Sequence, residues 1–435
     1  SSAASDVYKR QLYLLTVLAL GLGLVLAILV WRELRASPTV AATPTSRTAP
    51  AMETVQRGAY LAQVGNCALC HTTPGGEPYA GGKGVPTPFG TVYTSNLTPH
   101  PQTGLGAWDA EDFWRAMHEG RSRDGHLLYP AFPYTSFTQL ARDDSDALFA
   151  YLQTLTPADT PNRVHTLRWP YGTQWALAVW RVVNFHPSPA QANAPTGSDV
   201  ALRGAYLVHG LAHCNECHGG RNAWGAPDLR QTLGGATLPQ SLWYAPSLRS
   251  AREAGVAAWS VEDTVALLTT GANAHAVASG PMAEVVHHST QHLSTTDAQA
   301  MARYLAGLAP ADAGLPTPKP VPTGVQALGG RVYEAQCAQC HGKQGEGRAG
   351  AYPALAGNRA VQMPQYQNLV LGVLQGGFGP STHGLPQPHG MPPFQLVLTD
   401  AELAAVLSYI RNAWGNQAPA LSEFDINKFR NLQAP

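Results

Sequence analysis

The cysteines of this 435-residue chain restrict its possible structure more than any other feature. There are six, and all six belong to three copies of one short pattern. The copies are Cys67-Ala68-Leu69-Cys70-His71, Cys214-Asn215-Glu216-Cys217-His218 and Cys337-Ala338-Gln339-Cys340-His341. Two thiols three positions apart at the end of a helix can both reach one edge of a porphyrin, and the following histidine can then bind its iron. Each copy therefore predicts a covalently attached haem c.

Zinc sites, redox dithiols and disulfides are the other interpretations of this pattern. A zinc site of this spacing needs a second pair of ligands at a suitable interval, and none is present within each repeat. A redox dithiol does not need a histidine after its second cysteine. The three copies use every cysteine, so none is left over for a disulfide. We therefore expect three haem c groups, with His71, His218 and His341 as the proximal ligands of their irons.

Each cysteine motif lies in a longer repeated unit. A short helical stretch precedes the motif, and a glycine-rich loop, a middle helix, another loop and a closing amphipathic helix follow it. The middle helices begin near residues 110, 261 and 366, and the closing helices near 145, 297 and 400. We expect Asp297 and Asp400 to be N-caps of closing helices. Repetition at a large period indicates one fold copied along the chain, so the prediction is an all-α protein with three class I-like cytochrome c domains in tandem.

The linkers between the repeats differ in composition from the repeats themselves. The predicted order is a transmembrane anchor at 12–31, a flexible tether at 32–52, domain 1 at 53–157, a Trp-rich linker at 158–200, domain 2 at 201–309, a Pro-rich linker at 310–327, domain 3 at 328–416 and a C-terminal tail at 417–435. Trp169, Trp175 and Trp180 in the first linker are expected to pack a helix between domains. A docking surface for a membrane or a partner is the alternative. The second linker has no apolar period and is predicted to be a tether.

Residues 12–31, LYLLTVLALGLGLVLAILVW, form an uncharged apolar stretch. A helix of that length spans the ~30 Å hydrocarbon layer of a membrane. Lys9 and Arg10 precede the stretch, and Trp31-Arg32-Glu33-Leu34-Arg35 follows it in place of a small-residue cleavage site. A cleaved signal peptide is the competing interpretation, but its apolar core usually has about 7–15 residues. We therefore predict an uncleaved anchor. Covalent haem attachment occurs outside the bacterial cytoplasmic membrane, so the haem domains are expected on the periplasmic side of that membrane.

The composition contains few charges and many loop-forming residues. Charged residues make up 13% of the chain, against about 25% in an average soluble protein, and the formal net charge is +0. This balance does not indicate a nucleic acid as a partner. The 43 glycines and 35 prolines suit domains in which long irregular loops surround something other than a side-chain core.

Methionine is the usual second axial ligand of a c-type haem, and the chain contains six methionines. In the third repeat Met391 opens GMPPF, after a loop and before the closing helix, where this ligand is expected. In the second repeat Met282, in SGPMAEVV, occupies the corresponding place. Met301 lies inside a closing helix and is expected to belong to the core. Met363 lies early in its repeat and is expected to pack in the interior.

The first repeat departs from this pattern. Aligning LYPAFPYTSF with GMPPF places Phe132 where the methionine should be, and phenylalanine cannot bind iron. Met117, in the preceding helix, is the only methionine between residues 53 and 200. The prediction for the first haem is Met117, with His118 and His126 as alternative ligands and an open iron position as a further one. A core residue that touches the haem edge is the other interpretation of Met117.

Longer segments of the repeats resemble a known family. The first repeat contains CALCHTTPGGEPYAGG, TPFGTVYTSNLTP, GLGAWDAEDFWRAMHEG and LYPAFPYTSF. The second contains GPMAEVVHHSTQHLSTTD, and the third contains MPPFQLVLTDAELAAVLSYIRNAWGN. With these segments in this order, the chain from about residue 55 to residue 415 resembles the cytochrome c subunits of membrane-bound alcohol, aldehyde and sugar dehydrogenases of bacteria.

The resemblance implies an electron-transfer subunit and not an enzyme in its own right. Such subunits accept electrons from a separate catalytic subunit and pass them from haem to haem towards ubiquinone or a terminal oxidase. The implied catalytic partner carries pyrroloquinoline quinone, flavin, or molybdenum with iron–sulfur centres. Family members related to the alcohol dehydrogenase have methionine at the position of Phe132, so the resemblance leaves the ligation of the first haem open.

Two other functions are compatible with the same motifs. A haem peroxidase would use an open iron in the first repeat, with His118 or His126 as its distal acid–base group. A respiratory-oxidase subunit or a freestanding redox carrier would need no dehydrogenase partner. Copurification with a dehydrogenase subunit would separate the carrier from the leading prediction, and turnover of peroxide would reveal a peroxidase.

Overall fold

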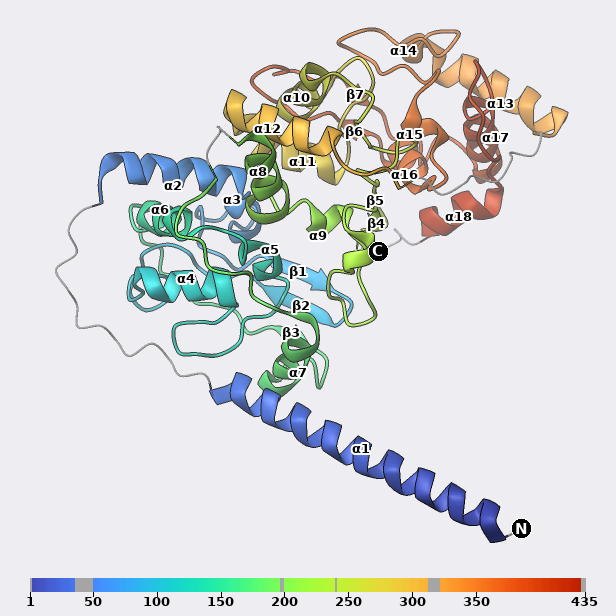
Figure 1. Ribbon diagram of the computed structural model, residues 1–435. Coiled ribbons are helices and arrows are strands. Elements are labelled where there is room, and N and C mark those ends of the chain that lie inside the picture. The colour runs from blue at the N-terminus through green and yellow to red at the C-terminus, as the bar shows by residue number, and fades with distance from the viewer. Residues whose placement is uncertain (1, 36–49, 196–198, 239–240, 312–320, 432–435) are drawn as a thin grey trace. The chain divides into compact units, whose positions relative to one another are not determined.

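The computed structural model describes residues 2–35, 50–195, 199–238, 241–311 and 321–431, with side chains from residue 7 onward. The chain forms two compact units, whose helices and strands are labelled in Figure 1. The first unit contains Ser1–Gly58 and His71–Asn193, and the second contains Ala59–Cys70 and Ala194–Pro435. The second and third repeats lie together in the second unit. The division into three domains stays a prediction. Most of the predicted tether and half of the Pro-rich linker lie outside the described residues.

The first unit is mostly helical, with a small sheet. Its elements are α1 (Ser2–Arg35), the start of α2 (Met52–Val64), the end of α3 (Cys67–His71), β1 (Gly84–Thr87), β2 (Gly90–Tyr93), α4 (Ala110–Glu119), α5 (Tyr134–Phe137), α6 (Arg142–Leu152), β3 (Thr166–Leu167) and α7 (Gln174–Asn184). β1, β2 and β3 form an antiparallel sheet in that order, with Val85 opposite Val92 and Thr91 opposite Thr166. The predicted helical fold is thus confirmed, with this small sheet as an addition that was not predicted. Gly90 makes the sheet possible, because a Cβ there would lie 2.2 Å from Thr166 O.

The second unit contains the rest of α2 and α3 and the elements that follow residue 194. These are α8 (Val200–Ala205), a π-helical turn (Tyr206–Leu211), α9 (Asn215–His218), a 3₁₀ turn (Leu229–Gln231), β4 (Ala236–Thr237), β5 (Tyr244–Ala245), α10 (Val261–Thr270), α11 (Pro281–His288), a second 3₁₀ turn (Thr290–His292), α12 (Thr295–Ala306), α13 (Thr323–Gln336), α14 (Ala338–His341), α15 (Arg359–Gln362), α16 (Gln367–Gln375), β6 (Gly377–Phe378), β7 (Gly390–Met391), α17 (Asp400–Ile410) and α18 (Glu423–Asn431). The strands form two short antiparallel pairs, β4 with β5 and β6 with β7.

The helix before each motif crosses the closing helix of the same repeat at a glycine. An added Cβ at Gly58, Gly204 or Gly329 would lie 1.9, 2.3 or 2.2 Å from the carbonyl oxygens of Ala147, Ala300 and Ala405. These distances are far below van der Waals contact, so only glycine lets the two helix backbones approach so closely. The crossing joins α2 to α6, α8 to α12, and α13 to α17, which gives all three repeats the same helix pair.

The number of residues between this glycine and the motif differs between repeats. Gly58 precedes Cys67 by nine positions, whereas Gly204 precedes Cys214 by ten. The second repeat accommodates the extra residue by a π-helical turn at Tyr206–Leu211, directly before its motif. A π-helical turn absorbs one inserted residue without ending the helix. The extra residue of the second repeat thus lies within the helix, whereas in the third repeat Gly329 precedes Cys337 by only eight positions.

The helix caps differ from the prediction at two closing helices. Asp297 and Asp400 were expected as N-caps, but the N-caps are Ser294 and Thr399. The Ser294 side chain accepts a hydrogen bond from Asp297 N, and Thr399 forms a capping box with Glu402. A serine or threonine three positions before an acidic residue is a favourable N-cap pattern, and both helices contain it.

The C-terminal segment predicted as a tail contains helix α18, which packs on the core of the third repeat. Ile426 and Phe429 are buried in that hydrophobic cluster. Arg430 forms an ion pair with Asp400 at 2.6 Å, and Tyr366 donates to Asp425 at 2.6 Å. The segment is therefore a structural part of the third repeat.

Helix α1 continues beyond the apolar stretch and contacts α7 within the first unit (Figure 1). Val7–Arg35 is long and apolar enough to cross a membrane. Residues 32–35, predicted as part of the tether, are helical. Among them Glu33 pairs with Arg121 at 2.6 Å and with Arg181 at 2.9 Å. Burial lowers the pKa of Arg121, whereas Glu33 raises it. Because two buried guanidinium groups without a carboxylate would be costly, Glu33 stabilises the contact of α1 with α7.

The three tryptophans of the first linker differ in burial. Trp180, in α7, is buried and packs against Tyr134. Trp169 and Trp175 are exposed. Helix α7 belongs to the first unit, and of the three tryptophans only Trp180 packs there. A helix packed between domains stays a prediction.

The glycine crossing makes a testable prediction in the third repeat. Gly329→Ala should destabilise the protein by about 2–3 kcal/mol, because its Cβ would overlap the backbone of α17. Gly372→Ala is the matched control, since no atom lies within 4 Å of its added Cβ in α16. The control should stabilise the protein by about 1 kcal/mol through helix propensity. Urea unfolding followed by circular dichroism measures both effects, and equal stabilities for the two variants would contradict the close crossing.

Candidate haem-binding sites

Each motif histidine is hydrogen-bonded through Nδ1 to a backbone carbonyl oxygen. The distances are 2.7 Å from His71 to Ser95, 2.7 Å from His218 to Pro246 and 3.0 Å from His341 to Pro353. A carbonyl oxygen only accepts, so each Nδ1 carries the proton and each Nε2 keeps its lone pair. An imidazole in this tautomer, oriented by its Nδ1–H bond, is the usual form of a metal ligand. The three histidines therefore fit the role of proximal ligands.

The protonation state of the first two histidines also fits iron binding. Burial lowers the pKa of His71 and of His218, although the carbonyl bonds of their Nδ1 atoms raise it. The lowered pKa keeps both rings neutral at neutral pH. No proton then has to leave Nε2 when a metal binds.

No disulfide joins the six cysteines. Burial, with a smaller contribution from the second thiol of each motif, raises the pKa of Cys67 and Cys214 to about 12 and that of Cys337 to about 11. The described residues contain no group of three or more His, Cys, Asp or Glu side chains suited to a metal ion. The motifs there thus lack the further ligands that a zinc site would need.

The carbonyl group of Ser95, which orients His71, belongs to a peptide group whose N–H is also hydrogen-bonded. The peptide between Ser95 and Asn96 accepts from His71 through Ser95 O and donates through Asn96 N to Asn162 Oδ1 at 2.8 Å. Because a peptide group is planar, these two bonds fix its orientation together. The direction of the His71 ring therefore depends on Asn162, in the segment before β3.

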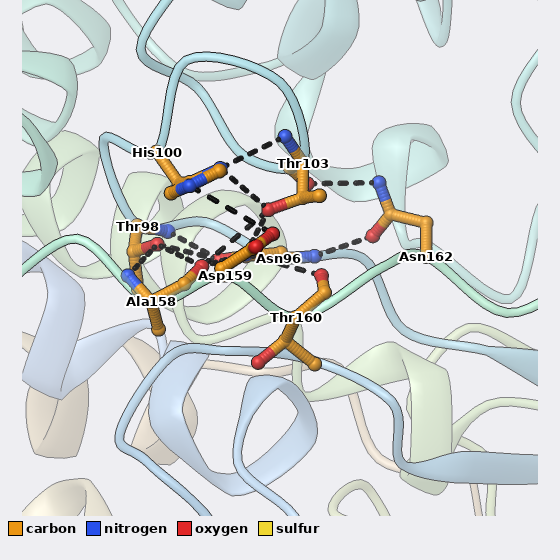
Figure 2. A network of polar contacts seen from close by, with 8 residues as sticks. All are labelled: Asn96, Thr98, His100, Thr103, Ala158, Asp159, Thr160 and Asn162. Atoms are coloured by element: carbon orange, nitrogen blue, oxygen red, sulfur yellow. Dashed lines mark hydrogen bonds and ion pairs between the residues drawn. The ribbon is translucent and has the colours of Figure 1, made fainter.

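Asn96 is the centre of a polar network, shown in Figure 2. Its Nδ2 donates to Ala158 O at 2.8 Å, and its Oδ1 accepts from the backbone and the hydroxyl of Thr98 at 2.9 and 2.8 Å. Thr103 Oγ1 is 3.3 Å from Asn96 Nδ2 and 2.8 Å from His100 Nδ1. Asn96 is only 2% exposed, so loss of its amide would leave buried polar groups without partners. The network joins the loop after β2 to the segment after α6.

The second and third repeats hold their acceptor carbonyls by other means. Beside Pro246, the Glu253 carboxylate accepts from Ser247 N at 2.7 Å and from Tyr244 Oη at 3.0 Å. After Pro353, the side chain of Asn416 accepts from Gly357 N at 2.8 Å and donates to Leu355 O at 2.9 Å. Each acceptor loop is thus fixed by one buried or half-buried polar side chain. That residue is an asparagine in the first and third repeats and a glutamate in the second.

The structure places the two predicted distal methionines between the middle and closing helices of their repeats. Met391 lies in β7, opposite Gly377, and packs against the hydrophobic cluster of the third repeat. Met282 is the second residue of α11 and is half-buried. Met301 and Met363 are buried, as predicted for core residues.

The candidate ligands of the first repeat lie in different environments. Met117 and His118, in α4, are both buried, and the His118 ring stacks on Trp114 at 4.4 Å. His126 is exposed and contacts the Asp124 carboxylate through Nδ1. Phe132 packs beside Phe137, with ring centroids 5.5 Å apart. The fold therefore brings Met117 and His118 into the interior and leaves His126 at the surface.

Met117 occupies a position that is aliphatic in the other two repeats. It lies three residues before Gly120, whose φ of 63° ends α4 in the left-handed conformation. Leu268 and Val373 lie three residues before the left-handed Gly271 and Gly376. Because leucine and valine cannot bind iron, this correspondence keeps the packing interpretation of Met117 open beside the ligand interpretation.

The helix that carries the first two cysteines is joined to the second repeat within the second unit. Tyr60 donates to Asp297 at 2.7 Å, and Ser289 Oγ donates to Val64 O at 2.7 Å. Burial, together with the bond to Asp297, raises the pKa of Tyr60 to about 12. The end of α2 is therefore fixed to α12 and to the turn after α11.

The first and second motifs are neighbours in the same unit. The residue before the second motif, His213, contacts Gly65 O, just before the first motif, at 3.3 Å. Burial and Glu216 raise the pKa of Cys217, and the thiol of Cys70 is close enough to raise it further. The thiol pairs of two predicted haem sites thus lie close together.

The second and third repeats are also joined directly. Asn368 accepts from Tyr244 N at 2.8 Å and donates to Tyr244 O at 2.6 Å. Arg359 donates to Gly255 O at 2.6 Å, and its guanidinium lies 4.5 Å from the ring centroid of Trp259. These contacts hold the second and third motifs in a single compact unit.

Comparison with known proteins agrees with this geometry. The family model for cytochrome c matches residues 55–156 and 326–414. The chain is 38% identical over 400 residues to the cytochrome c subunit of the quinone alcohol dehydrogenase of Gluconobacter oxydans (strain 621H), which covers 88% of this chain and 83% of that protein. The chain belongs to the cytochrome c subunits of membrane-bound dehydrogenases.

Other members of this family serve different dehydrogenases. The gluconate 2-dehydrogenase cytochrome c subunit of Pantoea cypripedii is 37% identical over 382 residues, or 84% of this chain and 87% of that protein. The fructose dehydrogenase cytochrome subunit of Gluconobacter japonicus is 33% identical over 441 residues, or 93% and 87%. The chain is accordingly an electron-transfer subunit and not the catalytic subunit, and its family implies covalently bound haem c.

Sequence reasoning did not find Asn96 or Asn162. The sequence TSNLTP contains an Asn followed two positions later by Thr, a pattern typical of a turn in which the Asn side chain accepts from the later backbone N–H. That pattern could have marked Asn96 as part of a local turn. Its link to His71 arises only from the fold, because Asn162 and Ala158 come from a distant part of the chain.

Asn96→Ala should change one haem and leave the others unaltered. Loss of the amide frees the Ser95 peptide, weakens the bond to His71 Nδ1 and makes this imidazole a poorer electron donor to iron. One of the midpoint potentials should rise by tens of millivolts in a spectroscopic redox titration. Asn184→Ala, which removes a bond to Trp180 O in α7 of the same unit, is the control and should shift none. Equal titrations for the two variants would contradict the positioning role of Asn96.

Proposed function

We propose that this chain is a membrane-anchored cytochrome with three haem c groups. It passes electrons from a periplasmic dehydrogenase subunit that oxidises an alcohol, an aldehyde or a sugar to ubiquinone or a terminal oxidase. The observation that carries the proposal is the same Nδ1–carbonyl bond at the histidine of all three motifs. The alcohol, gluconate and fructose dehydrogenases named for its relatives support this class of partner.

Each repeat would hold its own haem. The thioether bonds would form at Cys67 and Cys70, at Cys214 and Cys217, and at Cys337 and Cys340, with His71, His218 and His341 as proximal iron ligands. When bound, each haem supplies a reversible one-electron carrier. The protein contributes covalent attachment, a fixed imidazole and a partly buried environment, which are the features that set the potential of such a group. No catalytic residue is proposed.

The contacts of the second unit suit a relay between sites. The first motif is fixed to the second repeat through Tyr60 and Asp297, and the second repeat is fixed to the third through Asn368 and Tyr244. Direct hydrogen bonds within one compact unit limit changes of distance between the motifs. Electron transfer from one haem to the next depends on the distance between them. Constant distances between the motifs therefore suit such a relay.

The distal ligands proposed for the second and third haems are Met282 and Met391. For the first haem we propose Met117, with His118 and His126 as the alternatives. Helix α4 supports Met117 and His118, since both are buried there. His126 is exposed beside Asp124, and no contact of its ring places it near the other groups of the first repeat. The contact of His126 with Asp124 gives no support to a peroxidase in which His126 acts as the distal base.

Helix α1 is proposed to span the bacterial cytoplasmic membrane, with the haem repeats on the periplasmic side. The side chains of residues 12–30 are largely exposed leucine, valine, isoleucine, alanine and glycine, a surface that suits lipid rather than water. Tyr8 and Tyr13 near its start and Trp31 near its end are exposed aromatic residues, which favour the two interfaces of a bilayer.

Reduction of the haems by a copurified partner tests the proposed function. The tagged chain, isolated from membranes in mild detergent, should bring a catalytic dehydrogenase subunit with it. Addition of an alcohol, an aldehyde or a sugar should then reduce the haems, and a short-chain ubiquinone should reoxidise them. A chain that is isolated alone and shows no reduction with any of these substrates would favour the freestanding carrier.

Met117→Leu tests the ligand of the first haem. If Met117 binds iron, low-temperature electron paramagnetic resonance should show one low-spin haem converted to a high-spin or bis-histidine form, while the others persist. Met301→Leu, a change in the core of α12, is the matched control and should leave every haem unaltered. An unchanged Met117→Leu spectrum would overturn this assignment and direct the same test to His118.

A further inference from the structure

Three exposed aromatic residues gather before and at the start of α7. Trp169 is 82% exposed, Tyr171 is 42% exposed and Trp175 is 51% exposed. They lie within seven positions of one another, in the segment that joins β3 to α7 and in the first turn of that helix. Large aromatic rings that stay exposed so close together mark a surface that contacts something other than water.

Helix α7 separates its buried and exposed residues. Leu177 and Ala178 are buried in a cluster with Leu127, and Trp180 is buried beside Tyr134. Its exposed side chains are those of the first turn and of Val183. Trp175 is therefore additional to the buried packing of α7, and Tyr171 packs one side of its ring on Phe89, with centroids 4.5 Å apart, while 42% of it stays exposed.

The same helix is attached to the end of α1 at two levels. Val30 packs against the cluster that contains Leu177 and Ala178, and Glu33 pairs with Arg181 at 2.9 Å. On α1 the apolar residue Val30 comes three positions before Glu33. On α7 the apolar residues Leu177 and Ala178 come four and three positions before Arg181. Helices α1 and α7 therefore run parallel at their contact. The first turn of α7 lies on the side of the apolar part of α1.

Trp31 marks the level at which α1 leaves the apolar region. It is exposed, lies between Val30 and Glu33, and has the Arg35 guanidinium 4.6 Å from its ring centroid. Trp175 comes before Leu177 in the direction just described, and Trp169 and Tyr171 come earlier still. Trp175 thus lies at the level of Trp31 or on the apolar side of it, and Trp169 and Tyr171 lie in the turn that directly precedes α7.

We propose that Trp169, Tyr171 and Trp175 lie in the headgroup layer of a lipid bilayer, so that the first unit rests on the membrane surface beside α1. This inference rests on the proposed function, which makes α1 a membrane-spanning helix. Tryptophan and tyrosine favour this layer because each has an apolar ring and one polar group. Arg168 is exposed next to Trp169, and Arg32 and Arg35 lie at the end of α1. Their charges suit the phosphates of anionic lipids.

The pairing of Glu33 with two arginines has a role in this arrangement. It fixes the direction of α7 relative to α1 at the point where α1 would leave the bilayer. The Glu33 carboxylate is neutralised by Arg121 and Arg181, so no unpaired negative charge from this residue faces the anionic headgroups. The aromatic surface of Trp169, Tyr171 and Trp175 would therefore meet the lipid beside α1 without an unpaired carboxylate of Glu33 next to it.

Photocrosslinking in native membranes tests the proposal with the full, haem-loaded chain. The photoreactive residue p-benzoyl-phenylalanine replaces Trp169 in one variant and Trp175 in another. Leu22, exposed in the middle of α1, is the position for the bilayer control, and Trp224, 52% exposed in the second unit, is the control for an exposed tryptophan elsewhere. The haem absorbance spectrum of each variant verifies folding, and mass spectrometry identifies the adduct formed under ultraviolet light.

The expected result is a mass increase of one phospholipid at positions 169, 175 and 22, and none at position 224. A lipid adduct at position 22 without one at 169 and 175 would overturn this inference and leave the anchor intact. Adducts of 169 and 175 to a dehydrogenase subunit or to a second copy of the chain would overturn it in favour of a protein partner. Absence of a lipid adduct at position 22 would contradict the membrane anchor itself, and this inference with it.

Discussion

The hydrogen bond between the Nδ1 of each motif histidine and a backbone carbonyl is the interaction on which the rest of the structure depends. It selects the tautomer that can bind iron and sets the direction of the ring. A carbonyl can do this only if its own peptide is held still. Asn162 holds this peptide in the first repeat and Glu253 in the second, whereas in the third Asn416 holds the chain two residues beyond Pro353. Much of the irregular chain around the motifs therefore has a structural role, which accounts for the many glycines and prolines of the sequence.

The helices place these histidines through one repeated contact. A glycine at 58, 204 or 329 lets the helix before the motif touch the backbone of the closing helix, and the motif follows within a few turns. The first of these helices is shared, since its end is bonded to the second repeat through Tyr60 and Ser289. The chain consequently divides into two compact units although its sequence contains three repeats. Joining successive motifs in this way suits a chain that transfers electrons and moves no substrate.

Much of this arrangement follows from the sequence, and the rest depends on contacts between distant residues. The motifs, the middle and closing helices and the buried Met301 could be predicted, because spacing and helical periodicity are local properties. The sheet was not predicted, because β3 has only two residues and pairs with a strand far away in the chain. Asn96 and Glu33 were missed as positioning residues for a similar reason. Each looks like an ordinary polar residue until the fold supplies its partners, which are Asn162 for Asn96, and Arg121 after α4 and Arg181 in α7 for Glu33.

The number of haems bound to one chain tests the central claim of this account most directly. The pyridine haemochrome absorbance of the purified protein, divided by its concentration from amino-acid analysis, gives that number, and the intact mass gives it independently. The account predicts three haems per chain, with peptide mapping that locates one in each motif. Two haems per chain, with one pair of cysteines recovered as free thiols, would contradict it, because one of the three oriented histidines would then have no iron to bind.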